Sequence, residues 1–287
     1  MKPTHRLLLR FKVPSWPLVL RKPLIKALVS RKKTTSLPYT TVTKTGLVYE
    51  GNAADLIDYH VLSRGAFEPG LSKLLKDWAE SGQRDTFVDV GANSGLHTAY
   101  WSKYYRAGHA FEPYPPIFKK LLRTLELNSV NNVTPHALGL SSANAECEFL
   151  EPDSGNCGTG RLLVGKNDNP SRSVAKIAVR RGDEIMQIEQ GHISAIKVDV
   201  EGFEADVFSG FRERIASDRP LVVFELLSNS PKDAEAICAN LPNDYSYYEI
   251  TNIKSPKYGL IKWTAGSADV VAIPKEHSDF IKSHANG

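Results

Sequence analysis

The fold of this chain is decided by one short stretch, Thr86-Phe87-Val88-Asp89-Val90-Gly91-Ala92-Asn93-Ser94-Gly95. Its first half is apolar and rich in β-formers, which predicts a strand over residues 86–90. The two glycines that follow predict a tight turn, because glycine adopts conformations closed to other residues and lets a ligand approach the backbone. A helix is expected from about residue 95 to 105. This strand–turn–helix unit indicates either a ligand site or a tight turn that binds nothing.

Outward from this unit, short β-rich runs alternate with helical stretches, as in βαβ units of a parallel sheet. The pattern predicts a Rossmann-like, doubly wound α/β fold with a mostly parallel seven-stranded sheet whose last strand is antiparallel. The strands are expected near 86–90, 108–112, 133–137, 193–199, 221–225, 247–250 and 269–273, with helices near 95–105, 117–128 and 204–216 and from about 231.

The stretch 140–192 is less regular than the rest. It contains expected strands near 147–150 and 174–179 and a loop rich in Gly, Asn and Ser over 154–160. Insertions of this kind often cover an active site, so this segment is predicted to lie over the ligand.

Charged residues are distributed unevenly along the chain. Residues 1–49 contain 11 Lys or Arg and no Asp or Glu; since the whole chain carries +4, the remainder carries −7. We therefore predict a basic N-terminal extension over 1–60 and one domain over 61–287. The apolar runs of the arm are too short to span a membrane. The arm is expected to pack on its own domain or a neighbouring subunit, or to contact an anionic membrane surface weakly; a nucleic-acid partner is not favoured.

The cysteines, Cys147, Cys157 and Cys238, are odd in number and widely spaced, which argues against a disulfide framework. They indicate a reducing compartment, and we expect a cytoplasmic protein, peripheral to the membrane if the arm binds lipid. Sequence motifs typical of structural zinc sites do not occur in the chain.

Two groups of acidic residues stand at the ends of predicted strands. Glu112 ends the second strand, where a carboxylate can accept hydrogen bonds from a ribose diol, or can simply favour the start of the next helix. Asp199 ends the strand after the insertion, and Glu201 and Glu204 follow closely. Carboxylates this close can hold a metal ion or act as a general base, although Glu204 can also serve only as a helix-start residue.

Weaker candidates have simpler structural explanations. Asn156 lies in the Gly-rich loop, Glu225 ends a strand at the expected cleft, and His97 follows the glycine turn. A loop asparagine more often serves turn geometry, and a lone histidine is more often structural than catalytic.

Taken together, these motifs resemble the FkbM family of methyltransferases. The matching segments are FVDVGANSGLHT, AFEP, LELN with NNVTPHALG, IKVDVEGFEADVFSGF and LVVFEL, in the order of the family. The resemblance covers about residues 84–228 well, the tail only in outline and residues 1–60 not at all. It implies S-adenosylmethionine as the methyl donor and O-methylation of a hydroxyl on a sugar, polyketide or related natural product.

The resemblance also implies roles for individual residues. Asp199 and Glu201 would face the transferring methyl group and the acceptor, with Asp199 as the base or as the carboxylate that anchors a possible divalent ion and Glu201 assisting it. Glu112 would hold the ribose. The methionine part of the cofactor would be surrounded by Asp89, Gly91, Ala92, Asn93 and Gly95, and the adenine would lie beside Ala137, Leu138 and Gly139.

Three other functions compete with this interpretation. The first is a module that binds the cofactor without catalysis, which the presence of Asp199 and Glu201 argues against. The second is a nicotinamide oxidoreductase, which would be expected to carry G-x-G-x-x-G at the first turn, where this chain has G-x-x-x-G. The third is a nucleic-acid methyltransferase, suggested by the basic arm alone.

Overall fold

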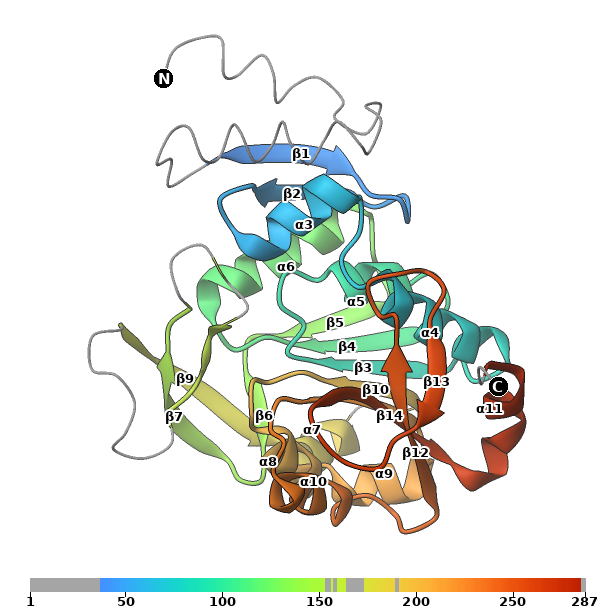
Figure 1. Cartoon of the computed structure of the whole chain (residues 1–287). Helices are drawn as coiled ribbons and strands as arrows, with labels where there is room; N and C mark the ends of the chain where they lie inside the picture. The colour runs from blue at the N-terminus through green and yellow to red at the C-terminus, as the bar shows by residue number, and fades with distance from the viewer. Residues whose placement is uncertain (1–36, 153–155, 157–158, 164–172, 189–190, 285–287) are drawn as a thin grey trace, which may run out of the picture.

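The computed structural model describes residues 37–152, 156, 159–163, 173–188 and 191–284 (Figure 1). The basic arm lies outside these residues for most of its length. Within the described part of the chain, none of the helices combines the length and the apolar character needed to cross a bilayer. Cys147 and Cys238 are both free thiols.

The central sheet has eight strands in the order β13-β12-β14-β11-β10-β3-β4-β5. Its five-stranded half from β11 to β5 is parallel, and β14 joins it antiparallel between β11 and β12. The strands are β3 (Thr86–Val90), β4 (Ala107–Phe111), β5 (Val133–His136), β10 (Ile193–Val198), β11 (Leu221–Leu226), β12 (Tyr245–Thr251), β13 (Gly259–Lys262) and β14 (Ala268–Pro274).

This order confirms the predicted doubly wound fold with an antiparallel last strand. The prediction of seven strands was one short, because β13 pairs with the outer edge of β12. Its four residues follow a polar turn and are too few to give a clear alternation in the sequence.

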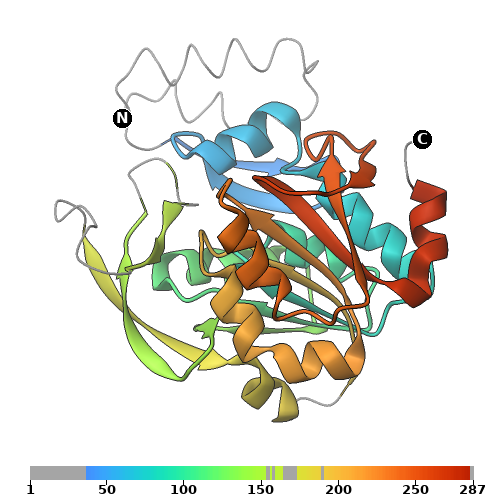
Figure 2. The ribbon, with the colours of Figure 1, turned by 60° about the horizontal axis from the view of Figure 1, so that its bottom comes forward.

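Helices cover both faces of the sheet (Figures 1 and 2). Val88 and Val90 of β3 pack toward one face, while Phe87 packs toward the other, as expected for a strand buried on both sides. The first face carries α8 (Glu204–Gly210), α9 (Arg212–Asp218) and α10 (Pro231–Cys238); the second carries α4 (Pro69–Glu80), α5 (Leu96–Trp101) and α11 (Ser278–His284), and α6 (Pro115–Leu127) packs beside α5.

The single helix expected over 204–216 is wrong, since α8 and α9 are separate helices that meet at Phe211. The Phe211 backbone leaves the helical region at φ −121° and ψ 12°, and its ring is completely buried in the core. Before it, Gly210 lies against the backbone of Ser141 so closely that a Cβ there would be 1.9 Å from the Ser141 oxygen. Packing of two distant segments thus breaks a helix that local periodicity alone would continue.

A hairpin and a helix precede the sheet and pack against it. They are β1 (Pro38–Val42), β2 (Val48–Asn52) and α3 (Leu56–Arg64). Leu47 is buried in a cluster with Ala99 and Leu121, and the Lys120 ammonium forms an ion pair with the buried Asp58 carboxylate at 2.6 Å. Residue 60, where the sequence predicts the end of the extension, lies within α3.

The irregular segment forms a second, smaller sheet beside the main one (Figure 2). Its strand order is β6-β9-β7-β8, from β6 (Gly139–Ser141), β7 (Ala145–Leu150), β8 (Arg161–Leu162) and β9 (Val174–Arg181), and α7 (Gly182–Ile188) follows it. Phe149, Ile177 and Val179 form its small core. These same three side chains also line the main pocket, so the structure places this segment over the candidate site, as the sequence predicts.

Candidate active site

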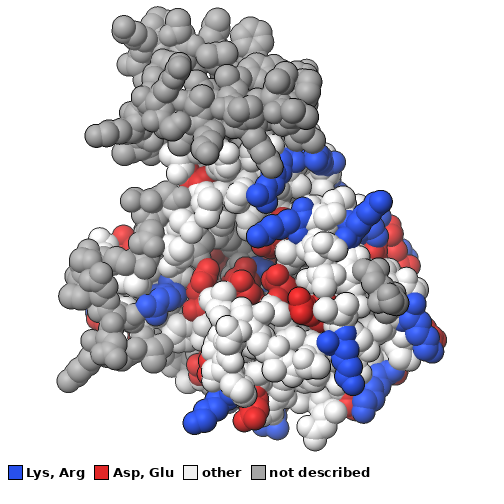
Figure 3. Space-filling model, in the orientation of Figure 1, with Lys and Arg blue, Asp and Glu red and all other residues white. Residues whose placement is uncertain are grey.

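A pocket of about 360 Å³ opens where the parallel strands β3, β4 and β10 end. Figure 3 shows a hollow in this region with acidic side chains gathered in it. The carboxyl ends of parallel strands meet at one edge of a sheet, which is where open α/β sheets bind their ligands. The pocket is therefore built by the strand ends that the sequence singled out.

The glycine turn forms the floor of this pocket. Gly91 has φ 74°, and a Cβ on it would lie 1.9 Å from the carbonyl oxygen of Asp199. Gly95 has φ 76°, and a Cβ there would lie 2.5 Å from the Leu121 side chain. Both glycines are thus needed for contact between parts of the protein itself, in addition to any closeness to a ligand. Asn93 also adopts a left-handed conformation, with φ 49°, and its side chain accepts a hydrogen bond from the Ser94 amide at 2.7 Å.

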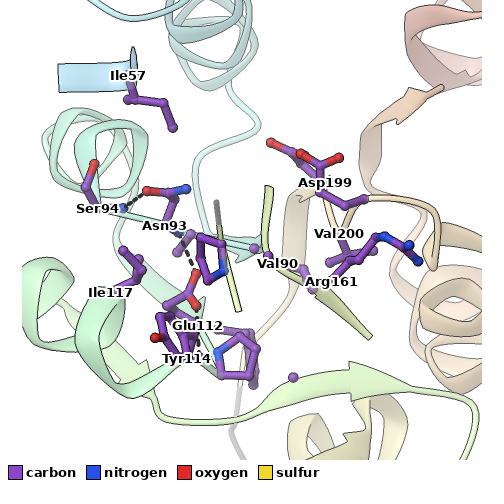
Figure 4. Close-up of a pocket in the computed structure, with 18 of the residues that line it drawn as sticks. Ile57, Val90, Asn93, Ser94, Glu112, Tyr114, Ile117, Arg161, Asp199 and Val200 are labelled. Atoms are coloured by element: carbon purple, nitrogen blue, oxygen red, sulfur yellow. Dashed lines mark hydrogen bonds between the residues drawn. The ribbon is translucent and has the colours of Figure 1, made fainter. Parts of the chain in front are cut away.

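Glu112 follows β4 directly and lies beside this turn, with both carboxylate oxygens held by the backbone (Figure 4). The Asn93 amide donates to Oε2 at 3.1 Å and the Tyr114 amide donates to Oε1 at 3.0 Å. The side chain is only 7% exposed, and burial raises its pKa to about 7 despite these two hydrogen bonds. A carboxylate has about four acceptor positions, so two remain for a ligand in the pocket.

A buried lysine, absent from the sequence-based candidates, connects the first and fourth parallel strands. Lys197 of β10 is 5% exposed and donates to the Gly91 carbonyl at 2.9 Å. Its Nζ lies 3.4 Å from Asp89 Oδ1 and 3.3 Å from Asp199 Oδ2. Burial alone would lower the pKa of Lys197, but the attraction of Asp199 and Asp89 outweighs it and raises the pKa above its usual value. A lysine within the apolar run Ile196-Lys197-Val198 was the available signal, because buried strands rarely carry an unpaired charge.

This ion pair explains where Asp89 lies. The side chain is fully buried, accepts a hydrogen bond from the Thr98 hydroxyl at 2.5 Å, and is not among the residues that line the pocket. The position beside it that a ligand ammonium group would need is taken by Lys197. This arrangement supports ordering of the turn by Asp89 over the direct contact with the cofactor that the family resemblance implies.

Asp199 and Glu201 both line the pocket, and Figure 4 shows Asp199 across it from Glu112. The Asp199 side chain is 37% exposed. Glu201 adopts a left-handed conformation with φ 56°, and burial together with the charges of Asp199 and Glu204 raises its pKa to about 7. Glu204 lies behind this loop, 4% exposed, and its Oε1 accepts from the amides of Val200 and Gly202, each at 3.2 Å. Glu204 thus braces the loop that carries Glu201.

Further carboxylates extend this acidic end. Glu225 follows the same edge on β11 and lines the pocket; burial, then Asp199 and Asp269, raises its pKa to about 8. Burial, then Glu68 and Asp199, raises the pKa of Asp269 to about 7. Glu68 lines the pocket as well. A carboxylate with a pKa near neutral pH is partly deprotonated there and takes up a proton more readily than an ordinary carboxylate, which suits a general base for an alcohol.

The remaining predicted site residues differ in whether they line the pocket. Gly139 lines the pocket, whereas Ala137 and Leu138 do not. Asn156 and His97 line it too, but the His97 ring also stacks on Trp101 at 5.0 Å and Nδ1 lies 3.0 Å from the Ser72 hydroxyl, which marks a packed, structural histidine. Among the described residues, no group of three or more His, Cys, Asp or Glu side chains is arranged to hold a metal ion.

The lining of the pocket suits S-adenosylmethionine. Glu112 offers free acceptor positions for a ribose diol, and beyond it lie apolar walls suited to a flat base, from Tyr114, Leu140, Phe149, Ile177 and Val179. Asp199, Glu201 and Glu225 stand at the other end. The residues present therefore fit a nucleoside with a cationic, reactive end, because acceptor, apolar and acidic surfaces all line one pocket.

Fold and site together define an α/β protein with a nucleoside-type pocket at the carboxyl ends of its parallel strands. The chain belongs to the FkbM family of methyltransferases, since residues 89–249 match the Methyltransferase FkbM domain. This match confirms the resemblance found in the motifs.

Two related proteins are each 30% identical to this chain. Hexuronic acid methyltransferase AglP of Haloferax volcanii matches over 169 residues, which are 58% of this chain and 65% of that protein. Methyltransferase 1 of Beauveria bassiana matches over 148 residues, 44% of this chain and 58% of that protein. The match thus spans less than two thirds of each relative's length.

Among solved structures, Methyltransferase FkbM from Methylobacillus flagellatus KT is 16% identical with a TM-score of 0.44, covering 75% of this chain and 52% of that one. The O-methyltransferase from Bacillus cereus in complex with SAH is 12% identical with a TM-score of 0.43, covering 72% of this chain and 81% of that one.

Proposed function

We propose that this protein transfers the methyl group of S-adenosylmethionine to a hydroxyl oxygen of a sugar or another glycan or natural-product acceptor. One observation carries the proposal. Glu112, which can hold a ribose, lines the same pocket as the carboxylates Asp199 and Glu201, which can take a proton. This arrangement supports a pocket in which one group binds the cofactor and another acts as the base.

Different residues of the chain bind the cofactor and orient the carboxylates. Glu112 accepts hydrogen bonds from the ribose hydroxyls, with its orientation fixed by the amides of Asn93 and Tyr114. Lys197 orients Asp199 through their 3.3 Å ion pair. Bound S-adenosylmethionine supplies an electrophilic methyl group, so the protein has to align an acceptor oxygen with it and remove the acceptor's proton.

Proton removal falls to the acidic end of the pocket. An alcohol is a weak nucleophile, and a base is most effective when its pKa lies near the working pH. Glu201, with a pKa of about 7, meets this condition. We therefore assign removal of the acceptor's hydroxyl proton to Glu201, with Asp199 beside it. Glu204 acts as a positioning residue, since it holds the Val200 and Gly202 amides on either side of Glu201.

A sugar acceptor is supported by the name of one relative, a hexuronic acid methyltransferase. Sugars present many hydroxyls, and the carboxylates of this pocket can both accept their hydrogen bonds and deprotonate one of them.

Calorimetric titration with S-adenosylmethionine, S-adenosylhomocysteine and NAD tests the proposal. Both sulfur ligands should bind, NAD should not, and Glu112→Ala should weaken binding by about tenfold or more, since hydrogen bonds to a charged group are lost. The exposed Glu146, on β7 outside the pocket, offers the control Glu146→Ala, which should bind as the unaltered protein does. Binding of NAD in place of the sulfur ligands would refute the proposal.

A further inference from the structure

A second cavity of about 830 Å³ adjoins the first. The two share four lining residues, His60, Phe67, Glu68 and Lys254, so they form neighbouring parts of one hollow. The first is lined by five carboxylates and three cationic side chains, whereas the second is lined by five cationic side chains and a single carboxylate, Glu68. These cations are Lys44, Arg64, Lys73, Lys76 and Lys254. Figure 3 shows basic side chains gathered beside the acidic hollow.

Three of these cations have no counter-charge in contact. Lys73 pairs with Asp77 and Lys76 with Glu80 on the same helix. Across the described part of the chain, Lys44, Arg64 and Lys254 show neither a salt bridge nor a side-chain hydrogen bond. Like charges around one cavity repel each other, and an anion bound among them would offset that repulsion.

The backbone holds these residues in place from segments far apart in the chain. The Lys44 amide donates to the Gly65 carbonyl at 2.7 Å, which fixes the β1–β2 turn to the end of α3 beside Arg64. The Gly70 amide donates to the Ile253 carbonyl at 2.8 Å, which fixes the loop before Lys254 to the start of α4. The backbone segments that carry Lys44, Arg64 and Lys254 are therefore fixed to their neighbours in the fold.

We propose that this second cavity, which we call the basic subsite, binds an oxyanion of the acceptor, carried as a sugar carboxylate or a phosphate group. The inference rests on the proposed function, because it assigns the acceptor's charged part to a place beside the methyl-transfer end. The acidic end repels an anion while the basic subsite attracts it. An acidic sugar is thus oriented with its charge among Lys44, Arg64 and Lys254 and with a neutral hydroxyl facing Asp199 and Glu201.

This orientation determines which oxygen is methylated. A carboxylate needs no base to react, and it would be destabilised next to several other carboxylates. A hydroxyl is neutral and needs the base that Glu201 provides. The separation of charge between the two cavities therefore favours an ether product on an anionic sugar over a methyl ester.

Binding measurements with defined probes test this inference. The probes are methyl glucuronide, glucose 1-phosphate and the neutral methyl glucoside, titrated with and without S-adenosylhomocysteine. At least one charged probe should bind about tenfold more tightly than methyl glucoside, as expected for one charge-assisted hydrogen bond or more. Which charged probe binds better identifies the carboxylate or the phosphate as the natural group.

Charge-reversal variants locate the site. Arg64→Glu and Lys254→Glu, singly and together, should abolish the preference for charged probes. Because Arg64 lines only the second cavity, Arg64→Glu should also leave S-adenosylhomocysteine affinity unchanged. Lys44→Glu, at an exposed position on the turn, is a further variant if either of these fails to fold. Lys232→Glu, on the exposed surface of α10 outside both cavities, is the matched control and should change nothing.

Three results would overturn the inference. They are equal affinities for charged and neutral probes, no binding of any charged probe at millimolar concentration, and a charge preference that survives the Arg64→Glu/Lys254→Glu double variant. Failure of the proposed function is a separate result, seen as loss of S-adenosylhomocysteine binding in the unaltered protein. Because each probe is also titrated without that ligand, the basic subsite is judged in either case.

Discussion

Gly91 and Asp199 meet backbone to backbone, so closely that a Cβ on Gly91 would lie 1.9 Å from the Asp199 carbonyl oxygen. The Asp199 amide in turn donates to the Val90 carbonyl at 3.1 Å. The turn after β3 and the loop after β10 are thus locked together. This contact fixes the floor of the cofactor pocket relative to Asp199 and to the loop that carries the proposed base, Glu201.

Gly91→Ala should therefore destabilise the protein by more than the strain of placing alanine in a left-handed backbone conformation. Gly46, with φ 78° and no atom within 4 Å of the position that a Cβ would take, matches Gly91 in backbone conformation but not in crowding. Gly46→Ala should cost about 1–2 kcal/mol from left-handed strain, and Gly91→Ala clearly more. Urea denaturation of both variants measures the difference. Equal losses would show that the loop after β10 yields to the new side chain.

The buried Lys197 is expected to be essential for stability. Lys197→Met keeps the volume but leaves the fully buried Asp89 without its counter-charge, which should cost about 3–5 kcal/mol. Adding Asp89→Asn should recover part of that loss, because the uncompensated charge is removed. Lys282→Met, at a fully exposed ion pair with Asp279, is the control and should leave the denaturation midpoint unchanged. A double variant as unstable as Lys197→Met alone would contradict the ion-pair explanation.

The stability of the ligand-free protein should fall as the pH rises from about 5 to 8. Burial raises the folded-state pKa of Glu112 from 4.5 to about 7, so its protonated form favours folding; this stability is complete below pH 4.5 and is lost as the pH passes 7. Glu112 alone should account for about 3 kcal/mol. Denaturation at a series of pH values should give a flatter profile for Glu112→Gln than for the unaltered protein.

The exposed Glu146 supplies the control for this measurement. Glu146→Gln should follow the pH profile of the unaltered protein, since its carboxylate is in water in both states. A Glu112→Gln profile parallel to that of the unaltered protein would mean that Glu112 is ionised in the fold at little cost.

Methyl transfer should rise with pH through about 7, because a base must be deprotonated to act and the raised pKa of Glu201 lies there. Glu201→Gln should lower kcat by about 100-fold or more and remove this rise, with S-adenosylhomocysteine affinity unchanged. The assay is transfer of a labelled methyl group to a hexuronic acid glycoside. Glu204→Gln keeps the acceptor oxygen that braces the loop and is expected to retain most of the activity. Persistence of the pH-dependent rise in Glu201→Gln would assign the base to another carboxylate, with Glu225 the next candidate.

The parallel core and the position of the pocket follow from the sequence alone. Apolar runs such as residues 86–90, a glycine turn, and an acid at a strand end are local patterns, and here the local conformation agrees with them. In α/β proteins the ends of parallel strands meet at one edge, so Glu112 and Asp199 could be assigned to one site from their order alone.

The arrangement of the charges depends on the tertiary structure. Lys197 reaches Asp89 and Asp199 because β10 pairs with β3, and this turns Asp89 away from the pocket. The basic subsite combines the β1–β2 turn, α3, α4 and the loop after β12, which are up to about 200 residues apart. The energy of a charge depends on its burial and on its neighbours in space. Neither can be predicted from the residues adjacent to it along the chain.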